Sequence, residues 1–82
     1  MKGNIVETGR GKDGSTFVFK DYVIKAVKYG RSAFGDYQIW GITVTKNLTP
    51  IWTQVVYLKS RRELKSAVEW VLNTAIKMER LK

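Results

Sequence analysis

The sequence predicts an α+β fold: an antiparallel four- to five-stranded β-meander followed by one C-terminal α-helix packed on one sheet face. Residues 4–59 contain short segments in which β-branched and aromatic residues alternate with polar ones, joined by connections too short for parallel crossovers. Residues 60–80 instead carry apolar residues at helical spacing. We therefore expect a single domain over residues 1–82, strand-rich from 4 to 59 and helical from about 60 to 80.

The strands are expected in order along the chain. A short strand over residues 4–8 precedes a turn that contains Gly9, Gly11 and Gly14, which tolerate positive φ. Residues 16–20, 22–29, 37–45 and 51–59 have the composition of strands. A loop over residues 30–36, bracketed by glycines, and a link over residues 46–50 connect the last three of them.

The helix is expected to start with a capping box. In this motif the Ser60 side chain accepts a hydrogen bond from the Glu63 amide, and Glu63 reaches back to the start of the helix. The residues that follow form one apolar stripe, which should cover the sheet: Leu64, Ala67, Val68, Val71, Leu72, Ala75 and Ile76.

Alternation along the strands sorts their residues into two faces. The bulkier, uncharged set is expected under the helix: Phe17, Phe19, Ile24, Ala26, Trp40, Ile42, Val44, Trp52, Val56 and Leu58. The other set is expected on the uncovered face: Lys20, Val23, Lys25, Val27, Tyr29, Tyr37, Ile39, Thr43, Thr45, Val55, Tyr57 and Lys59. A register error of one residue would exchange the faces within a strand.

The charge balance points to a polyanionic partner. The sequence contains fifteen Lys and Arg residues but only seven Asp and Glu residues, which gives a formal charge of +8 on 82 residues. Cysteine and histidine are absent, which removes the usual zinc and haem ligands and the commonest general base. With no paired carboxylates or serine–base arrangement either, we expect no enzyme activity, no cofactor and no metal site.

The uncovered face is interpreted as a platform for unpaired bases. Its tyrosines would stack on bases while neighbouring cations contact phosphates. The expected nucleic-acid-binding residues are Arg10, Lys12, Lys20, Lys25, Tyr29, Arg31, Phe34, Tyr37, Tyr57, Lys59, Arg61 and Arg62. A subunit interface or an ordinary surface are the alternatives for this face.

Several of these residues have plainer interpretations. Phe34 stands in a loop, and folding back to plug the end of the core is the favoured explanation for it. Arg10 and Lys12 fit an ordinary hairpin turn, since the Walker spacing is absent. For Arg61 and Arg62 a solvated charge cluster competes evenly with a phosphate patch.

A second contact surface is expected on the helix. Trp70, Thr74 and Leu81 lie away from the apolar stripe, and an exposed tryptophan favours a partner. Burial of Trp70 under the N-terminal segment is the competing explanation. The small core adds a reason to expect a homodimer.

The order of strands and helix over residues 16–76 resembles the positive cofactor 4 family of single-stranded-DNA-binding coactivators. The family has a basic, glycine-containing segment before its last strand, whereas residues 47–50 read Asn-Leu-Thr-Pro. Double-stranded-RNA-binding domains and Apetala2-type sheets share a similar order, so no family is assigned.

These observations predict a small basic protein that binds DNA or RNA, preferentially single-stranded, through phosphates and base faces with little sequence specificity. The alternative is a protein–protein interaction module, such as a small viral or phage-type inhibitor that docks on an acidic partner. No apolar run is long enough to span a membrane, and the N-terminus lacks a secretory pattern. We therefore expect a soluble protein that is cytoplasmic or otherwise intracellular and associated with nucleic acid.

Overall fold

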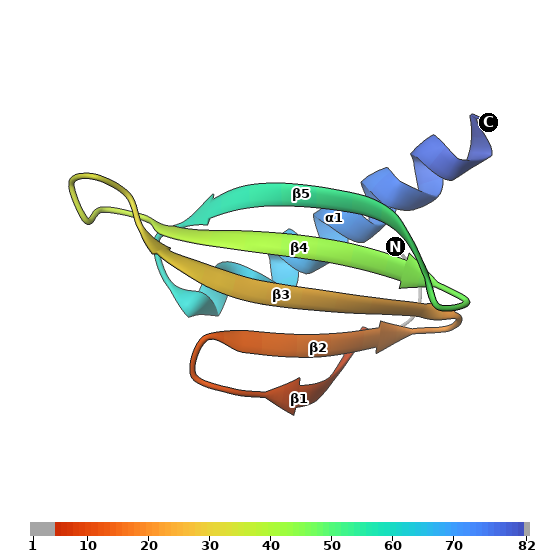
Figure 1. Cartoon of the computed structure of the whole chain (residues 1–82), viewed down its shortest axis with the longest axis horizontal. Helices are drawn as coiled ribbons and strands as arrows, with labels where there is room; N and C mark the ends of the chain where they lie inside the picture. Colours follow the sequence, from red (N-terminus) through yellow and green to blue (C-terminus); the bar gives the residue numbers. More distant parts are fainter. Residues whose placement is uncertain (1–4, 82) are drawn as a thin grey trace.

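A computed structural model describes residues 5–81 of the chain. It contains five strands, a short 3₁₀ turn and one helix, shown in Figure 1: β1 (Val6–Arg10), β2 (Gly14–Phe19), β3 (Tyr22–Arg31), β4 (Gln38–Lys46), β5 (Thr49–Leu58), η1 (Arg61–Glu63) and α1 (Leu64–Arg80). The strands form one antiparallel sheet in chain order, and α1 covers one of its faces. The predicted fold class is confirmed. Asn4, with which the first strand was expected to begin, lies outside the described residues.

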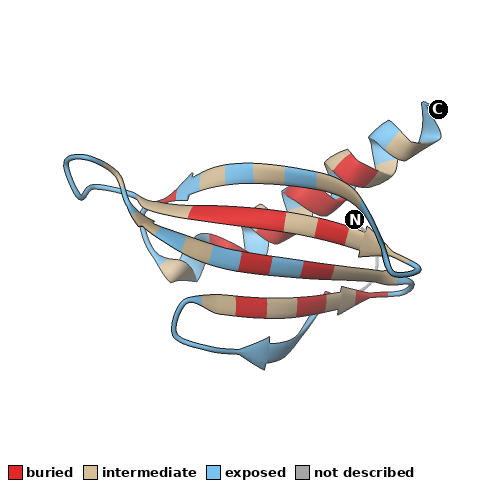
Figure 2. Cartoon of the chain, in the orientation of Figure 1, coloured by how far each residue is buried: buried red, intermediate tan, exposed pale blue. Residues whose placement is uncertain are grey.

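The predicted sorting of the strand residues is confirmed for the covered face, whereas Lys20, Tyr37 and Lys59 of the predicted uncovered set lie outside the strands. Residues of the bulky set pair across the sheet, as in the row Phe17, Ile24, Val44 and Trp52. All of this set is buried under α1 except Trp52 and Val56, which are partly buried against the core. The predicted helix stripe meets them, with Leu64, Val68, Val71, Leu72 and Ala75 buried (Figure 2).

Polar groups on this covered side are satisfied locally. The indole Nε1 of Trp40 donates to Gln38 Oε1 at 3.0 Å, and that of Trp52 donates to Gln54 Oε1 at 2.9 Å. Each pair is two residues apart on one strand, so both side chains point to the same face. The glutamines therefore allow two large indoles to pack under the helix without an unsatisfied N–H.

The predicted capping box is wrong. Ser60 makes no side-chain cap hydrogen bond; its carbonyl oxygen accepts from the Glu63 amide at 3.1 Å. Glu63 Oε1 accepts instead from the Lys59 amide at 2.6 Å. The physical reason is that the first turn is 3₁₀ and the α-helix begins only at Leu64: in that turn the Ser60 carbonyl, rather than its side chain, takes the Glu63 amide, although the Ser60 backbone is extended.

The link between β4 and β5 is shorter than predicted. Both strands extend until only Asn47 and Leu48 remain between them, at φ 51° and 66°. Positive φ at both central residues is the geometry of a type I′ hairpin, whose twist matches that of the strands. Pro50 falls near the start of β5, an edge strand where its missing N–H is tolerated.

Candidate functional site

Most of the predicted binding residues come together at one end of the sheet. Successive strands run in opposite directions, so the β1–β2 turn, the β3–β4 loop and the β5–η1 segment share an end, which we call the loop end (Figure 1). All the predicted residues except Lys20 and Lys25 belong to the loop end or to strand termini next to it. Lys20 lies in the β2–β3 turn at the opposite end, and Lys25 lies in the middle of β3.

The face of the sheet opposite α1, which we call the open face, is not covered by any described residue. Tyr29 and Tyr57 are exposed there, and Tyr37 is exposed just before β4. Tyr57 pairs with Ile39, and Gly41 is the next residue of β4 on the same face. Tyr29, which lies over Gly41, and Tyr57 are therefore neighbours near the loop end, where Tyr37 also lies.

The ring of Tyr29 lies close against the sheet because Gly41 has no side chain beneath it. A Cβ placed on Gly41 would lie 2.4 Å from Tyr29 Oη, 2.6 Å from Cε2 and 2.7 Å from Cζ. Tyr29 occupies a register shift of β3 between Lys28 and Gly30, which tilts its side chain over β4. The ring thus packs on backbone from one side while 66% of the residue stays exposed. The alternation predicted the tyrosine, but nothing in it marked Gly41.

The open face is less cationic than the sequence suggested. By strand register, Lys25 is the one charged side chain that the described strands place on it. Lys20 occupies a turn, and Lys59 follows the end of β5. Valines, threonines and tyrosines make up most of the rest of this face, so positive charge surrounds it at the ends of strands rather than covering it.

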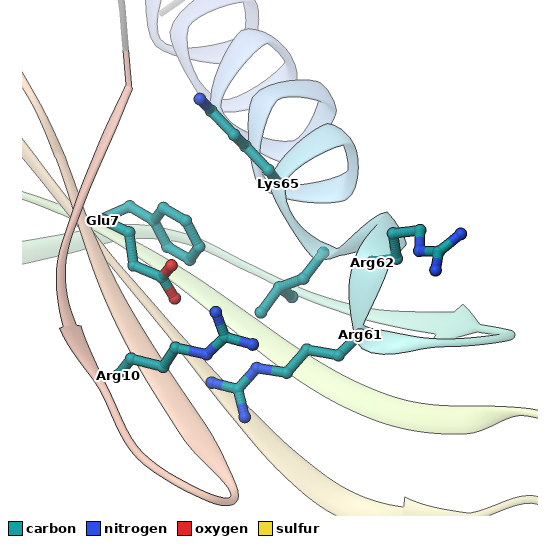
Figure 3. A pocket seen from close by; sticks show the side chains of 7 residues that line it. Glu7, Arg10, Arg61, Arg62 and Lys65 are labelled. Carbon is teal, nitrogen blue, oxygen red and sulfur yellow. The ribbon is translucent and has the colours of Figure 1, made fainter.

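A second cluster of cations lies on the helix side of the loop end. Arg10 on β1, Arg61 and Arg62 in η1, and Lys65 on α1 border a cleft of about 460 Å³ together with Glu7. Figure 3 shows the guanidinium groups of Arg10 and Arg61 pointing toward one another, whereas Arg62 points away. The Glu7 carboxylate already accepts a 2.6 Å hydrogen bond from Ser15 Oγ. We call this group the arginine cleft; two facing guanidinium groups with one nearby carboxylate favour an anion.

Arg61 also stabilises the fold, through hydrogen bonds to the β1–β2 turn. Its Nη1 donates to the Lys12 carbonyl and its Nη2 to the Gly14 carbonyl, both at 2.9 Å. Its guanidinium also stacks 5.4 Å from the centre of the Trp40 ring. Arg61 therefore fastens the start of the helix to the β1–β2 turn, which the sequence pattern did not indicate. Arg10 and Arg62 have no such hydrogen-bond partner among residues 5–81 and remain available to a ligand.

Phe34 does not plug the core. It is 90% exposed at the tip of the β3–β4 loop, so the favoured interpretation was wrong. The loop closes on itself instead: the Ser32 amide donates to the Tyr37 carbonyl, and the Gly35 amide donates to the Ser32 carbonyl. Gly35 takes a φ of 73°, and its carbonyl accepts from Arg31 at 3.2 Å. These closures leave Phe34 outside, where a partner could contact its ring.

The helix surface predicted as a second interface is exposed. Trp70 is 56% exposed, Leu81 more so, and Thr74 Oγ1 donates back to the Trp70 carbonyl at 2.9 Å. The competing explanation, burial of Trp70 under the N-terminal segment, does not hold for the described part of that segment. Ile5 is buried in the core while Trp70 is not.

The described residues offer no arrangement suited to holding a metal: His, Cys, Asp and Glu side chains nowhere gather in threes between residues 5 and 81. The one α-helix in that range is too short and too polar to cross a bilayer. Comparison with protein-family models, curated proteins and solved structures finds no match to the chain.

Proposed function

We propose that this protein binds single-stranded nucleic acid at the loop end, with bases on the open face and phosphates on the surrounding cations. The observation that carries the proposal is the group formed by Tyr29 and Tyr57, exposed on the open face, and Tyr37, exposed just before β4 at the same end of the sheet. An aromatic ring fixed to a sheet stacks on any base and contributes about 1–3 kcal/mol per base.

The positions of the cations favour a single strand over a duplex. Lys59 follows β5 beside the open face at the same end as the tyrosines, and Arg31 ends β3 there, paired with Gln38 and therefore directed toward the covered side. Bases of a single strand can turn toward the rings while its backbone follows the cationic rim, whereas bases in a duplex are already paired and stacked.

Fluorescence anisotropy with labelled oligonucleotides tests the proposal. We expect a single-stranded oligonucleotide to bind more tightly than a duplex of the same sequence, with an affinity that falls as salt rises. Oligonucleotides of different sequence should bind within a few-fold of one another. Absence of binding even at low salt would refute the proposal.

A protein partner is the second candidate function. Val27 and Val55, together with Ile39, make the centre of the open face apolar, which suits a protein surface as well as bases. The two candidates separate when Tyr29, Tyr37 and Tyr57 are replaced by Ser, because charge stays constant. Oligonucleotide binding should fall under the first candidate; under the second, a stoichiometric protein partner should survive nuclease treatment in a pulldown.

A further inference from the structure

The two edges of the sheet differ in a way that predicts where it associates. The β1 edge is five residues long, carries Glu7 and Arg10, and shifts register between Glu7 and Gly9. Short length, charge and a bulge each discourage another strand from pairing there. The β5 edge is ten residues long and contains no charged residue. Its irregularities, Pro50 and a register shift that leaves Ile51 unpaired in the register, fall at its start, so residues 52–58 present a regular edge.

We propose that β5 is a dimerisation strand, which pairs antiparallel with β5 of a second copy about a two-fold axis. The absence of charge along β5 makes this edge the place where a second copy can be accommodated. Two chains of +8 repel each other, and contact along β5 brings no charged side chain of either strand against the other. A two-fold antiparallel pair is also self-complementary, because open-face residues such as Thr53, Val55 and Tyr57 meet one another.

The helix side of this edge supplies further apolar surface. α1 packs mainly against β5 and β4, so it lies close to the β5 edge. Met78 and Leu81 of the helix segment line an apolar cleft with Ile51 and Trp52 of β5. Trp70 belongs to the same i, i+4 row as Met78. Because neighbouring strands lie about 4.8 Å apart, pairing of β5 would bring the two helices within reach of such large side chains.

This arrangement has a consequence for the open face. A two-fold axis perpendicular to the sheet places both helices on one side and both open faces on the other. The two sheets then become continuous, with Tyr57 of each copy near the junction. The proposal stands independently of nucleic-acid binding, since every observation that carries it concerns the β5 edge and the adjoining helix surface.

Analytical ultracentrifugation without nucleic acid tests the proposal with two matched variants. Val55 on β5 and Val27 on β3 are 50% and 47% exposed, lie on the same face, and pair with Gly41 from opposite sides. Val55→Lys places like charges across the junction, so association should weaken about tenfold or more. Val27→Lys adds the same charge away from the junction and should remain dimeric like the wild type.

A second measurement locates the contact. The chain has no cysteine, so Lys25→Cys creates a single site for a spin label on β3. Five strand spacings separate β3 from its copy in the proposed dimer, which gives a label separation of about 25 Å. A monomeric wild type at about 100 μM, well above the micromolar dissociation constants of modest interfaces, overturns the proposal. So does equal association of the two lysine variants, or a label separation beyond about 40 Å.

Discussion

Gly41→Ala should disable the tyrosine platform while the sheet remains folded. Gly41 does not have a positive φ, so its backbone conformation is open to any residue. Glycine is required there because the Tyr29 ring occupies the space that a side chain would need. An added methyl group would overlap the Tyr29 ring, with three ring atoms at 2.4–2.7 Å from the new carbon. The backbone of a central strand cannot yield, whereas an exposed ring can, so Tyr29 should swing off the sheet.

The expected change in stability is small. Tyr29 is 66% exposed, so about a third of a side chain of roughly 200 Å² is covered, which corresponds to about 1.7 kcal/mol at 25 cal/mol per Å². Alanine in place of a strand glycine recovers about 0.5–1 kcal/mol of conformational entropy. The net loss is then about 1 kcal/mol, or about 4–8 °C in Tm for a chain of this size.

The expected change in binding is larger. Loss of a stacking ring costs about 1–3 kcal/mol per base, a 5- to 150-fold weaker affinity. Anisotropy should show Gly41→Ala to be as weak as Tyr29→Ala, and the double variant no weaker than either. Gly9→Ala is the control, because its Cβ would meet Thr16 at an ordinary 3.8 Å. Wild-type affinity in Gly41→Ala beside a weakened Tyr29→Ala would refute the proposed geometry.

Three further outcomes follow from the charged residues. Urea denaturation should show that Arg61→Ala loses about 2 kcal/mol, because Arg61 donates to two carbonyl oxygens, while the neighbouring, exposed Arg62→Ala stays within about 0.5 kcal/mol. Lys59→Gln should flatten the slope of log affinity against log salt by about 0.7, one single-strand phosphate contact, because Lys59 is exposed beside the open face. A hydrogen bond to Glu79 raises the pKa of Lys46 above its usual 10.5, so this stabilisation is complete below pH 10.5 and is lost as pH rises through the folded-state pKa. Glu79→Gln should therefore lose less stability than the wild type between pH 9 and pH 12.

The layers of the fold were predictable because each depends on a repeated pattern. Strand alternation and the helical stripe both extend over many residues, so a single ambiguous position does not change the result. The bulky set could be assigned to the helix side because a charged residue such as Lys25 is costly to bury. The boundaries of the strands and of the helix depend on fewer residues, and the predicted start of the helix and the predicted β4–β5 link were wrong. Leu48 at positive φ is not a usual turn residue, so the two-residue hairpin was not expected.

The functional residues were predictable as types but not as arrangements. Arg61 was one of several cations in the sequence, and only the approach of the β1–β2 turn distinguishes it from Arg62. Phe34 looked like a core residue because it is apolar; the hydrogen bonds that close its loop determine its exposure. Gly41 has no local pattern at all, since its role depends on a ring from another strand. The roles of Arg61 and Gly41 depend on contacts with residues of other strands or turns, and the exposure of Phe34 depends on the hydrogen bonds of its loop.

The separation of apolar and charged surface constrains how a nucleic acid could lie on the protein. On the open face, Lys25 is the one charge that the described strands supply, so most phosphates would find no cation there. A strand bound as proposed would therefore run along the rim at the loop end, past Lys59, with its bases turned inward over the tyrosines. Binding of this kind would draw its affinity from stacking as much as from charge. Its salt dependence should then correspond to the few rim cations rather than to the full charge of +8.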